Sequence, residues 1–222
     1  MNRSIPALLL VAMMAGCATS KPVPPAIPPI VVASPPSKAD AWRRIASAAD
    51  ADRIKGLETA WLQGLADAHA HGFGDEVRKE GLLLKSAAAQ PRPAPSPGSY
   101  SCRMVRIGTV GRKAAFERFK PFFCYVQAEG DLLTIVKQTG SQRPAGRLWE
   151  DDVATRLVYL GSLALGDENA PLAYGEDSKR DMAGVMERIA PFVWRLVIPW
   201  PQGSSKLDVY ELTPVAEQPK AK

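Results

Sequence analysis

The stretch FVWRLVIPWPQGSSKLDVYELTPV (residues 192–215) decides the fold class. It contains two short runs rich in β-branched and aromatic residues, and the sequence Trp200-Pro201-Gln202-Gly203 separates them with a turn signal. Successive side chains of a strand point to opposite faces, so Leu207 and Val209 share one face of the second run. The stretch therefore predicts two consecutive β-strands joined by a turn.

Similar runs precede this pair, and turn-forming residues such as Glu129-Gly130-Asp131 separate them. In one run Phe122, Cys124 and Val126 fall on a single face. About eight short strands in succession predict an antiparallel meander over residues 91–215, closed as a small barrel or folded as a sandwich. The earlier runs are SYSCRMVRI, FFCYVQ, LLTIVK, RLWE, RLVYLGSLAL and AGVMERI.

Residues 39–90 have a different pattern, with apolar side chains at the spacing of an amphipathic helix. Asp40 is a candidate N-cap of a first helix, and Asp50 or Asp52 is a candidate N-cap of a longer one. A shorter helix is expected from Glu76 to Lys85. Together with the meander, these helices predict an α+β fold in which a small helical unit packs on a barrel-like sheet. The apolar positions of the longer helix are Ile54, Leu57, Trp61, Leu62, Leu65 and Ala68.

The first residues have the features of an export signal. Arg3 supplies a positive charge, and the apolar run behind it falls short of the ~20 residues of a membrane-spanning helix. The sequence Met14-Ala15-Gly16-Cys17 resembles the lipobox of bacterial lipoproteins, in which the cysteine is lipidated and becomes the first residue. We therefore expect residues 1–16 to be a lipoprotein signal peptide; an ordinary signal peptide with an incidental cysteine is the alternative. Because Ala18 is not Asp, the sorting rule of that class implies the outer membrane.

Residues 17–38 are rich in proline, with seven prolines between Lys21 and Lys38. Proline is excluded from helix interiors and central strands, and it favours the extended polyproline conformation at ~3.1 Å per residue. From Ala18 to Lys38 the reach is up to ~65 Å. We expect this segment to be a tether that holds the globular part off a membrane, and residues 216–222 to be a disordered tail.

The chain has three cysteines, and Cys17 is assigned to the lipid anchor. Cys102 and Cys124 lie in strand-like runs of an exported chain, so we expect a disulfide between them. The chain-entropy model gives that bond a stabilisation of roughly 3 kcal/mol. Two buried free thiols are the alternative, and a metal site lacks the second cysteine pair or nearby histidine that would complete it.

No residue is assigned a catalytic role. The only histidines, His69 and His71, point to different faces of a helix. The sequence contains no glycine-rich phosphate-binding loop, and we expect no cofactor and no metal. A net charge of +5 permits contact with an anionic envelope component and does not require nucleic acid.

Two stretches are candidate binding sites. The segment between Cys102 and Cys124 is basic, and on a tethered protein it is suited to phosphate headgroups or another anionic partner; a solvated loop is the alternative. The run TGSQRPAGRL (139–148) combines arginines, which suit carboxylate or phosphate, with glycines that let a ligand approach the backbone. A turn with internal hydrogen bonds is the alternative for this run. Its candidate ligand-binding residues are Thr139, Ser141, Arg143 and Arg147.

Gly98-Ser99-Tyr100, with Trp194 and Arg195 near the other end of the chain, is similar to the signature of lipocalin-type and bacterial inhibitor barrels. In those barrels a late arginine packs across the first aromatic ring, an arrangement that cation–π attraction favours. The similarity implies that Arg195 packs on Tyr100.

A set of short motifs spreads over roughly residues 40–215. The motifs are Tyr100–Arg103, Lys137–Arg147, Tyr159–Ser162, Tyr174-Gly175, Arg180-Asp181, Gly184, Trp194–Leu196 and Pro199. Together they resemble an uncharacterised family of proteobacterial lipoproteins, the domain of unknown function DUF4893. The resemblance implies an exported protein and no particular activity.

The expected function is that of a periplasmic lipoprotein, anchored to the outer membrane of a Gram-negative bacterium, that binds a ligand or an envelope protein. The shortage of histidine and the barrel-like pattern favour a binding module over an enzyme. One alternative is a structural envelope lipoprotein without a ligand. The other is a hydrolase, which requires Asp151, Asp177 and Asp181 to converge in one cleft with Arg143 or Arg180.

Overall fold

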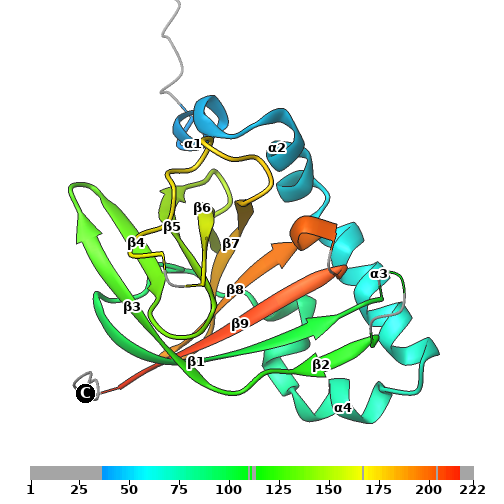
Figure 1. The fold of residues 1–222 in the computed structure, drawn as a ribbon. Coiled ribbons are helices and arrows are strands. Elements are labelled where there is room, and N and C mark those ends of the chain that lie inside the picture. The colour runs from blue at the N-terminus through cyan, green and yellow to red at the C-terminus, as the bar shows by residue number, and fades with distance from the viewer. Residues whose placement is uncertain (1–36, 110, 112–113, 167, 204, 216–222) are drawn as a thin grey trace, which may run out of the picture. The chain divides into compact units, whose positions relative to one another are not determined.

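The computed structural model describes residues 37–109, 111, 114–166, 168–203 and 205–215. The expected signal peptide, lipidated cysteine and tail, and all of the expected tether but its last two residues, lie outside the described residues. Within the described part, nine strands form one antiparallel sheet in the order β2-β1-β3-β4-β5-β6-β7-β8-β9, and β1 also pairs with β9. This last pairing closes the sheet into a barrel and leaves β2 as an extra strand beside β1 (Figure 1).

The expected antiparallel meander is therefore confirmed as a closed barrel, and the α+β class is confirmed with it. The sequence does not predict β2, because three residues are too few to show alternation. The strands are β1 (Gly98–Ile107), β2 (Phe116–Arg118), β3 (Phe122–Glu129), β4 (Leu132–Lys137), β5 (Gln142–Glu150), β6 (Arg156–Leu165), β7 (Asp181–Ala190), β8 (Val193–Pro199) and β9 (Leu207–Pro214).

The expected longer helix is divided in two at Gly56. A Cβ atom at this position would collide with the Trp200 ring, so the packing of the indole requires glycine there. The helical elements are α1 (Asp40–Ile45), α2 (Ala48–Lys55), α3 (Leu57–Ala70), α4 (Gly74–Lys79) and the 3₁₀ turns η1 (Gly81–Leu84), η2 (Ser86–Ala88) and η3 (Pro201–Gly203). None of these helices is long and apolar enough to cross a bilayer.

The expected helix caps are wrong in detail. Residue 39 precedes α1, so Asp40 lies inside the first turn. Ser47 caps α2: its hydroxyl accepts a hydrogen bond from the Asp50 backbone N–H at 3.1 Å and donates one to the Asp50 carboxylate at 2.9 Å. This reciprocal arrangement is a variant of the capping box, and it places Asp50 at the third helical position.

The helices cover the outer face of part of the barrel wall. α2 contacts β7, α3 contacts β1, β8 and β9, and η1 contacts β7 and β9 (Figure 1). Leu207 and Val209 share this face, as the alternation predicted. Because large apolar side chains each contribute about 1.5–3 kcal/mol when they are buried, this layer is a major source of stability. It brings together Trp42, Ile54, Trp61, Leu83, Val105, Ile107, Val185, Val197, Leu207 and Val209.

Arg195 of β8 lies on the covered face and is fully buried. Its Nε donates to the Glu187 carboxylate of β7 at 2.7 Å, and its guanidinium carbon lies 4.8 Å from the centre of the Trp61 ring. Its two terminal nitrogens donate to four backbone carbonyls of the η1–η2 segment at 2.8–3.3 Å. Those carbonyls belong to Leu82, Leu83, Lys85 and Ser86. We call this set of contacts the Arg195 clasp.

The expected contact between Arg195 and Tyr100 is wrong. Arg195 and Trp194 are consecutive in β8, so their side chains lie on opposite faces of the wall. Trp194 faces the interior, where its ring packs edge-on against Tyr100 with centroids 5.9 Å apart. The tryptophan therefore takes the contact that the similarity assigned to the arginine.

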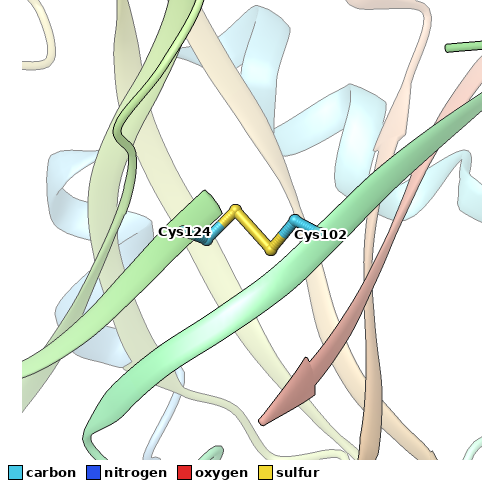
Figure 2. The surroundings of a disulfide bond; sticks show 2 residues. All are labelled: Cys102 and Cys124. Atoms are coloured by element: carbon cyan, nitrogen blue, oxygen red, sulfur yellow. A yellow bond between two sulfur atoms is a disulfide. The ribbon is translucent and has the colours of Figure 1, made fainter. Parts of the chain in front are cut away.

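The barrel interior contains the expected disulfide. Cys102 of β1 and Cys124 of β3 are bonded, with their Cα atoms 6.0 Å apart (Figure 2). Both are almost fully buried, and Cys124 shares its face with Val126 as predicted. The bond crosses between neighbouring strands beside the place where β9 closes the barrel onto β1.

We expect Arg195→Ala to lower the free energy of unfolding by about 3–5 kcal/mol, because the Glu187 carboxylate would stay buried without its partner and four carbonyls would each lose one hydrogen bond. Arg195→Lys should lose less, since it keeps the charge but not the planar fork. Urea denaturation followed by tryptophan fluorescence measures both. Arg78→Ala, at an exposed arginine of α4, is the control; an equal midpoint for Arg78→Ala and Arg195→Ala would contradict the role of the clasp.

Candidate ligand cavity at the barrel mouth

A cavity of about 520 Å³ lies at the end of the barrel where β4 and β5 are joined. Its size is within the range of small-molecule sites, and barrel mouths are frequent locations for such sites. Polar side chains and an aromatic wall line it together. The lining residues that matter below are Arg106, Phe119, Phe122, Lys137, Asp208 and Tyr210.

Arg106 and Asp208 form the polar wall of the cavity. They are opposite each other in the β1–β9 pair, and two parallel hydrogen bonds of 2.7 Å join them. The Ser205 hydroxyl donates to the same carboxylate at 2.8 Å. The hydrogen bond to Asp208 raises the pKa of Arg106 even though burial opposes the rise. This pair is neutralised internally and fixes the shape of the wall.

Lys137 is a half-buried cation of the cavity wall. It is opposite Cys124 in the β3–β4 pair, so its half-buried side chain faces the interior. Within the described part of the chain, no carboxylate forms an ion pair with it; its Nζ lies 4.3 Å from the centre of the Phe122 ring. Burial, and then the charge of Arg143, lower the pKa of Lys137. A desolvated ammonium group without a counter-ion is typical of an anion site.

Three rings form the aromatic wall. Phe122 and Tyr210 pack edge to face with centroids 6.2 Å apart, and the Arg106 guanidinium lies 5.2 Å from the centre of the Phe119 ring. The wall therefore offers apolar contact area directly beside the ammonium group of Lys137. Such a combination suits a ligand with an acidic group and an apolar body.

The structure does not bring the four residues of the 139–148 run together. Thr139 lines the cavity mouth. Arg143 donates to the backbone carbonyls of Gly140 and of residues 166 and 168, so it holds two loops together. Arg147 forms a two-pronged ion pair with Glu129 on the outer face. Ser141 is exposed, and its backbone carbonyl accepts from the Gly166 N–H.

The basic side chains between the two cysteines also lie on both faces of the barrel wall. Arg103 points outward to Glu80 and Glu211 at 2.6 and 2.5 Å, and Arg118 pairs with the same Glu80. Arg106 points inward to Asp208. Arg112 and Lys113 lie outside the described residues. The described arginines of this segment are therefore bound to carboxylates of the protein itself.

The three carboxylates of the hydrolase alternative do not share one cleft: Asp177 and Asp181 lie in one turn at the start of β7, and Asp151 has other partners. Asp151 accepts from Trp42 Nε1 at 3.3 Å and from Arg156 at 2.6 Å. Asp177 lies 3.5 Å from Arg180, and Asp181 accepts from the Gly175 N–H at 2.9 Å. None of the three lines the mouth cavity.

Neither histidine lies in the mouth cavity, and the described residues form no metal site. His71 pairs with Asp67 at the exposed end of α3, at 3.2 Å, and a Cβ at Gly74 would contact the ring of His69. Among the described residues, no group of three His, Cys, Asp or Glu side chains is placed to hold a metal ion.

Sequence reasoning missed Lys137 and the Arg106–Asp208 pair as site residues. The alternation of β4 could have indicated Lys137, because Lys137 is two residues after the inward-facing Ile135 and so lies on the same face. A lysine at an inward position of a strand predicts either a ligand or a buried partner. The pairing of Arg106 with Asp208 depends on the closure of the barrel, which joins segments a hundred residues apart.

The fold and the cavity together define an antiparallel barrel with a cavity at one mouth and helices packed on part of its outer wall. The family model of the domain of unknown function DUF4893 matches residues 42–212, so the chain belongs to that family. This match confirms the family resemblance. Comparison with the curated proteins and with the solved structures finds no match.

The raised pKa of the Asp181 carboxyl group predicts a pH dependence of the stability of the protein. It is 5% exposed, and burial raises the pKa of its carboxyl group, with the charges of Asp50 and Asp177 adding to the rise. When the folded pKa exceeds the unfolded one, the contribution to stability is full below the unfolded pKa, about 4, and is lost as the pH rises through the folded pKa.

We therefore expect the wild type to lose stability relative to Asp181→Asn as the pH rises from about 4 toward neutrality. The asparagine oxygen still accepts from the Gly175 N–H, so the loop between β6 and β7 keeps that contact. Urea midpoints at a series of pH values measure the difference, with Asp131→Asn in the exposed β3–β4 turn as the control. A pH-independent difference between Asp181→Asn and the wild type would refute this account of Asp181.

Proposed function

We propose that this barrel is a non-catalytic binding module that takes a small amphipathic anion into its mouth cavity. One observation carries the proposal: Lys137 is half-buried, faces the cavity and has no acidic partner among the described residues. Removing an ammonium group from water without a counter-ion is costly, so an anion that pairs with it recovers that cost.

The contacts place the two ends of the ligand. Its acidic group pairs with Lys137, and the exposed Lys120 at the rim adds to the attraction. Its apolar body lies along Phe119, Phe122 and Tyr210. Arg106 stays engaged with Asp208 and forms the polar wall. A carboxylate, sulfonate or phosphate monoester on an apolar chain or ring meets these requirements.

The fluorescent amphipathic anion 8-anilinonaphthalene-1-sulfonate tests the site. We expect Lys137→Gln to weaken its binding about tenfold, because a charge-assisted hydrogen bond is lost from a partly desolvated site. Lys79→Gln removes the same charge from the exposed end of α4 and should leave the affinity unchanged. Equal affinities for the wild type and Lys137→Gln would reject the site.

The affinity for the dye should also depend on pH. Because burial lowers the pKa of Lys137, the wild type should lose affinity at a lower alkaline pH than an ordinary lysine site would. Lys137→Gln should lack this loss. Dodecanoate should displace the dye from the wild type in competition.

The location of the protein is part of the proposal. The lipobox-like Met14–Cys17 and the proline-rich segment behind it support a lipid anchor at Cys17 and a barrel that faces the periplasm from the outer membrane. More than one acyl chain is needed for stable attachment. On such a tether, the mouth cavity would meet amphipathic anions that leave or enter the membrane.

We expect Cys17→Ser to move the protein from the membrane fraction to the soluble fraction of a Gram-negative host and to abolish labelling with radioactive palmitate. Ser20→Ala, which keeps the cysteine, is the control and should stay in the membrane fraction. A Cys17→Ser protein that still sediments with the membrane and takes up palmitate would exclude this anchor.

A further inference from the structure

The hydroxyl of Tyr159 is buried inside the barrel without a partner. The residue is fully inaccessible to solvent, and within the described part of the chain its oxygen has no hydrogen-bond partner. Leaving a buried polar group unsatisfied costs about 1–3 kcal/mol, so such a group needs an explanation. The indole N–H of Trp194 is a second interior donor in the same condition.

Two glycines make room for this tyrosine. Gly146 and Gly161 are opposite each other in the β5–β6 pair, and a Cβ atom at either position would collide with the Tyr159 ring. Gly184 is the cross-strand neighbour of Tyr159 in β7. The ring therefore lies along the inner surface of β6, and its hydroxyl lies over Gly161.

This placement puts the hydroxyl on the mouth side of the Tyr159 ring, behind residues that line the cavity; Tyr159 itself does not line it. Leu163 is two residues beyond Gly161 on the same face of β6 and lines the cavity. Met182 is the partner of Gly161 in β7 and lines the cavity as well. Methionine is unbranched and flexible, so Met182 can rearrange to admit a ligand.

We infer that the Tyr159 hydroxyl is a second, deeper ligand contact, and that the anion bound in the cavity carries an acceptor oxygen, such as a ketone, in its apolar body. This inference rests on the proposed function. Burial raises the pKa of Tyr159, so the phenol stays protonated and donates. An oxygen that only accepts satisfies this donor without introducing an unpaired proton.

Calorimetric titration of the full chain with dodecanoate and with a positional series of its mono-ketone derivatives tests the inference. We expect at least one derivative to bind the wild type about tenfold more tightly than dodecanoate. Tyr159→Phe should abolish that advantage while binding dodecanoate as the wild type does. Without ligand, Tyr159→Phe should be at least as stable as the wild type, because it removes an unsatisfied hydroxyl. Tyr125→Phe on the outer face of β3 is the matched control.

The outcomes separate the two proposals. A ketone advantage that persists in Tyr159→Phe, or no advantage in any derivative, overturns the inference and leaves the Lys137 site standing. A uniform loss for dodecanoate and ketones in Tyr159→Phe shows a structural role and also overturns it. If dodecanoate does not bind the wild type, or binds Lys137→Gln equally well, the proposed function fails, and the inference fails with it.

Discussion

The buried contact of Arg195 with Glu187 and four backbone carbonyls holds the helical unit to the barrel. The η1–η2 segment ends a series of short helices, and the last carbonyls of a helix lack the donors that a further turn would supply. The carbonyls of Leu82 and Lys85 accept from the backbone N–H groups of Lys85 and Ala88 as well as from Arg195. A guanidinium group with five donors on a neighbouring strand satisfies several of them at once. Only with these groups satisfied can the segment lie against an apolar wall. The outer layer of β7 and β8 therefore depends on one side chain.

The alternation of side chains along each strand determines which residues face the cavity and which face outward. Arg103 and Arg106 are three residues apart in β1, and they belong to different networks because they lie on opposite faces. The outward one binds Glu80 and joins α4 and η1 to the sheet, whereas the inward one shapes a cavity. For this reason the basic segment is not a single positively charged surface. Its arginines instead belong to two separate sets of ion pairs, one on each face of the sheet.

The sequence predicts the features that depend on local patterns. The strand runs, the inward face of Cys124 and Val126 and the disulfide follow from alternation and from two cysteines in neighbouring strands. Features that depend on long-range closure are not predictable in this way. Glycine is required at position 56 because the distant Trp200 ring fills the space, and Asp208 meets Arg106 only after β9 pairs with β1. Lys137 is visible in the alternation of β4, but its lack of an acidic partner among the described residues depends on all the surrounding strands.

Two parts of the barrel interior differ in how well their side chains are paired, and this difference bears on both stability and the proposed binding. One part is fixed by the disulfide and by the packing of Tyr100 on Trp194, so it is rigid without a ligand. The other part holds an ammonium group and a phenol, and among the residues that the structure describes the first has no counter-ion and the second no acceptor. Both groups cost free energy in the empty barrel, and a ligand that supplies an anion and an acceptor removes both costs at once. Because such a ligand binds only the folded chain, it raises the stability of the fold by mass action. Under the proposed function, the free energy that these unpaired groups cost in the empty barrel would return as affinity for the ligand.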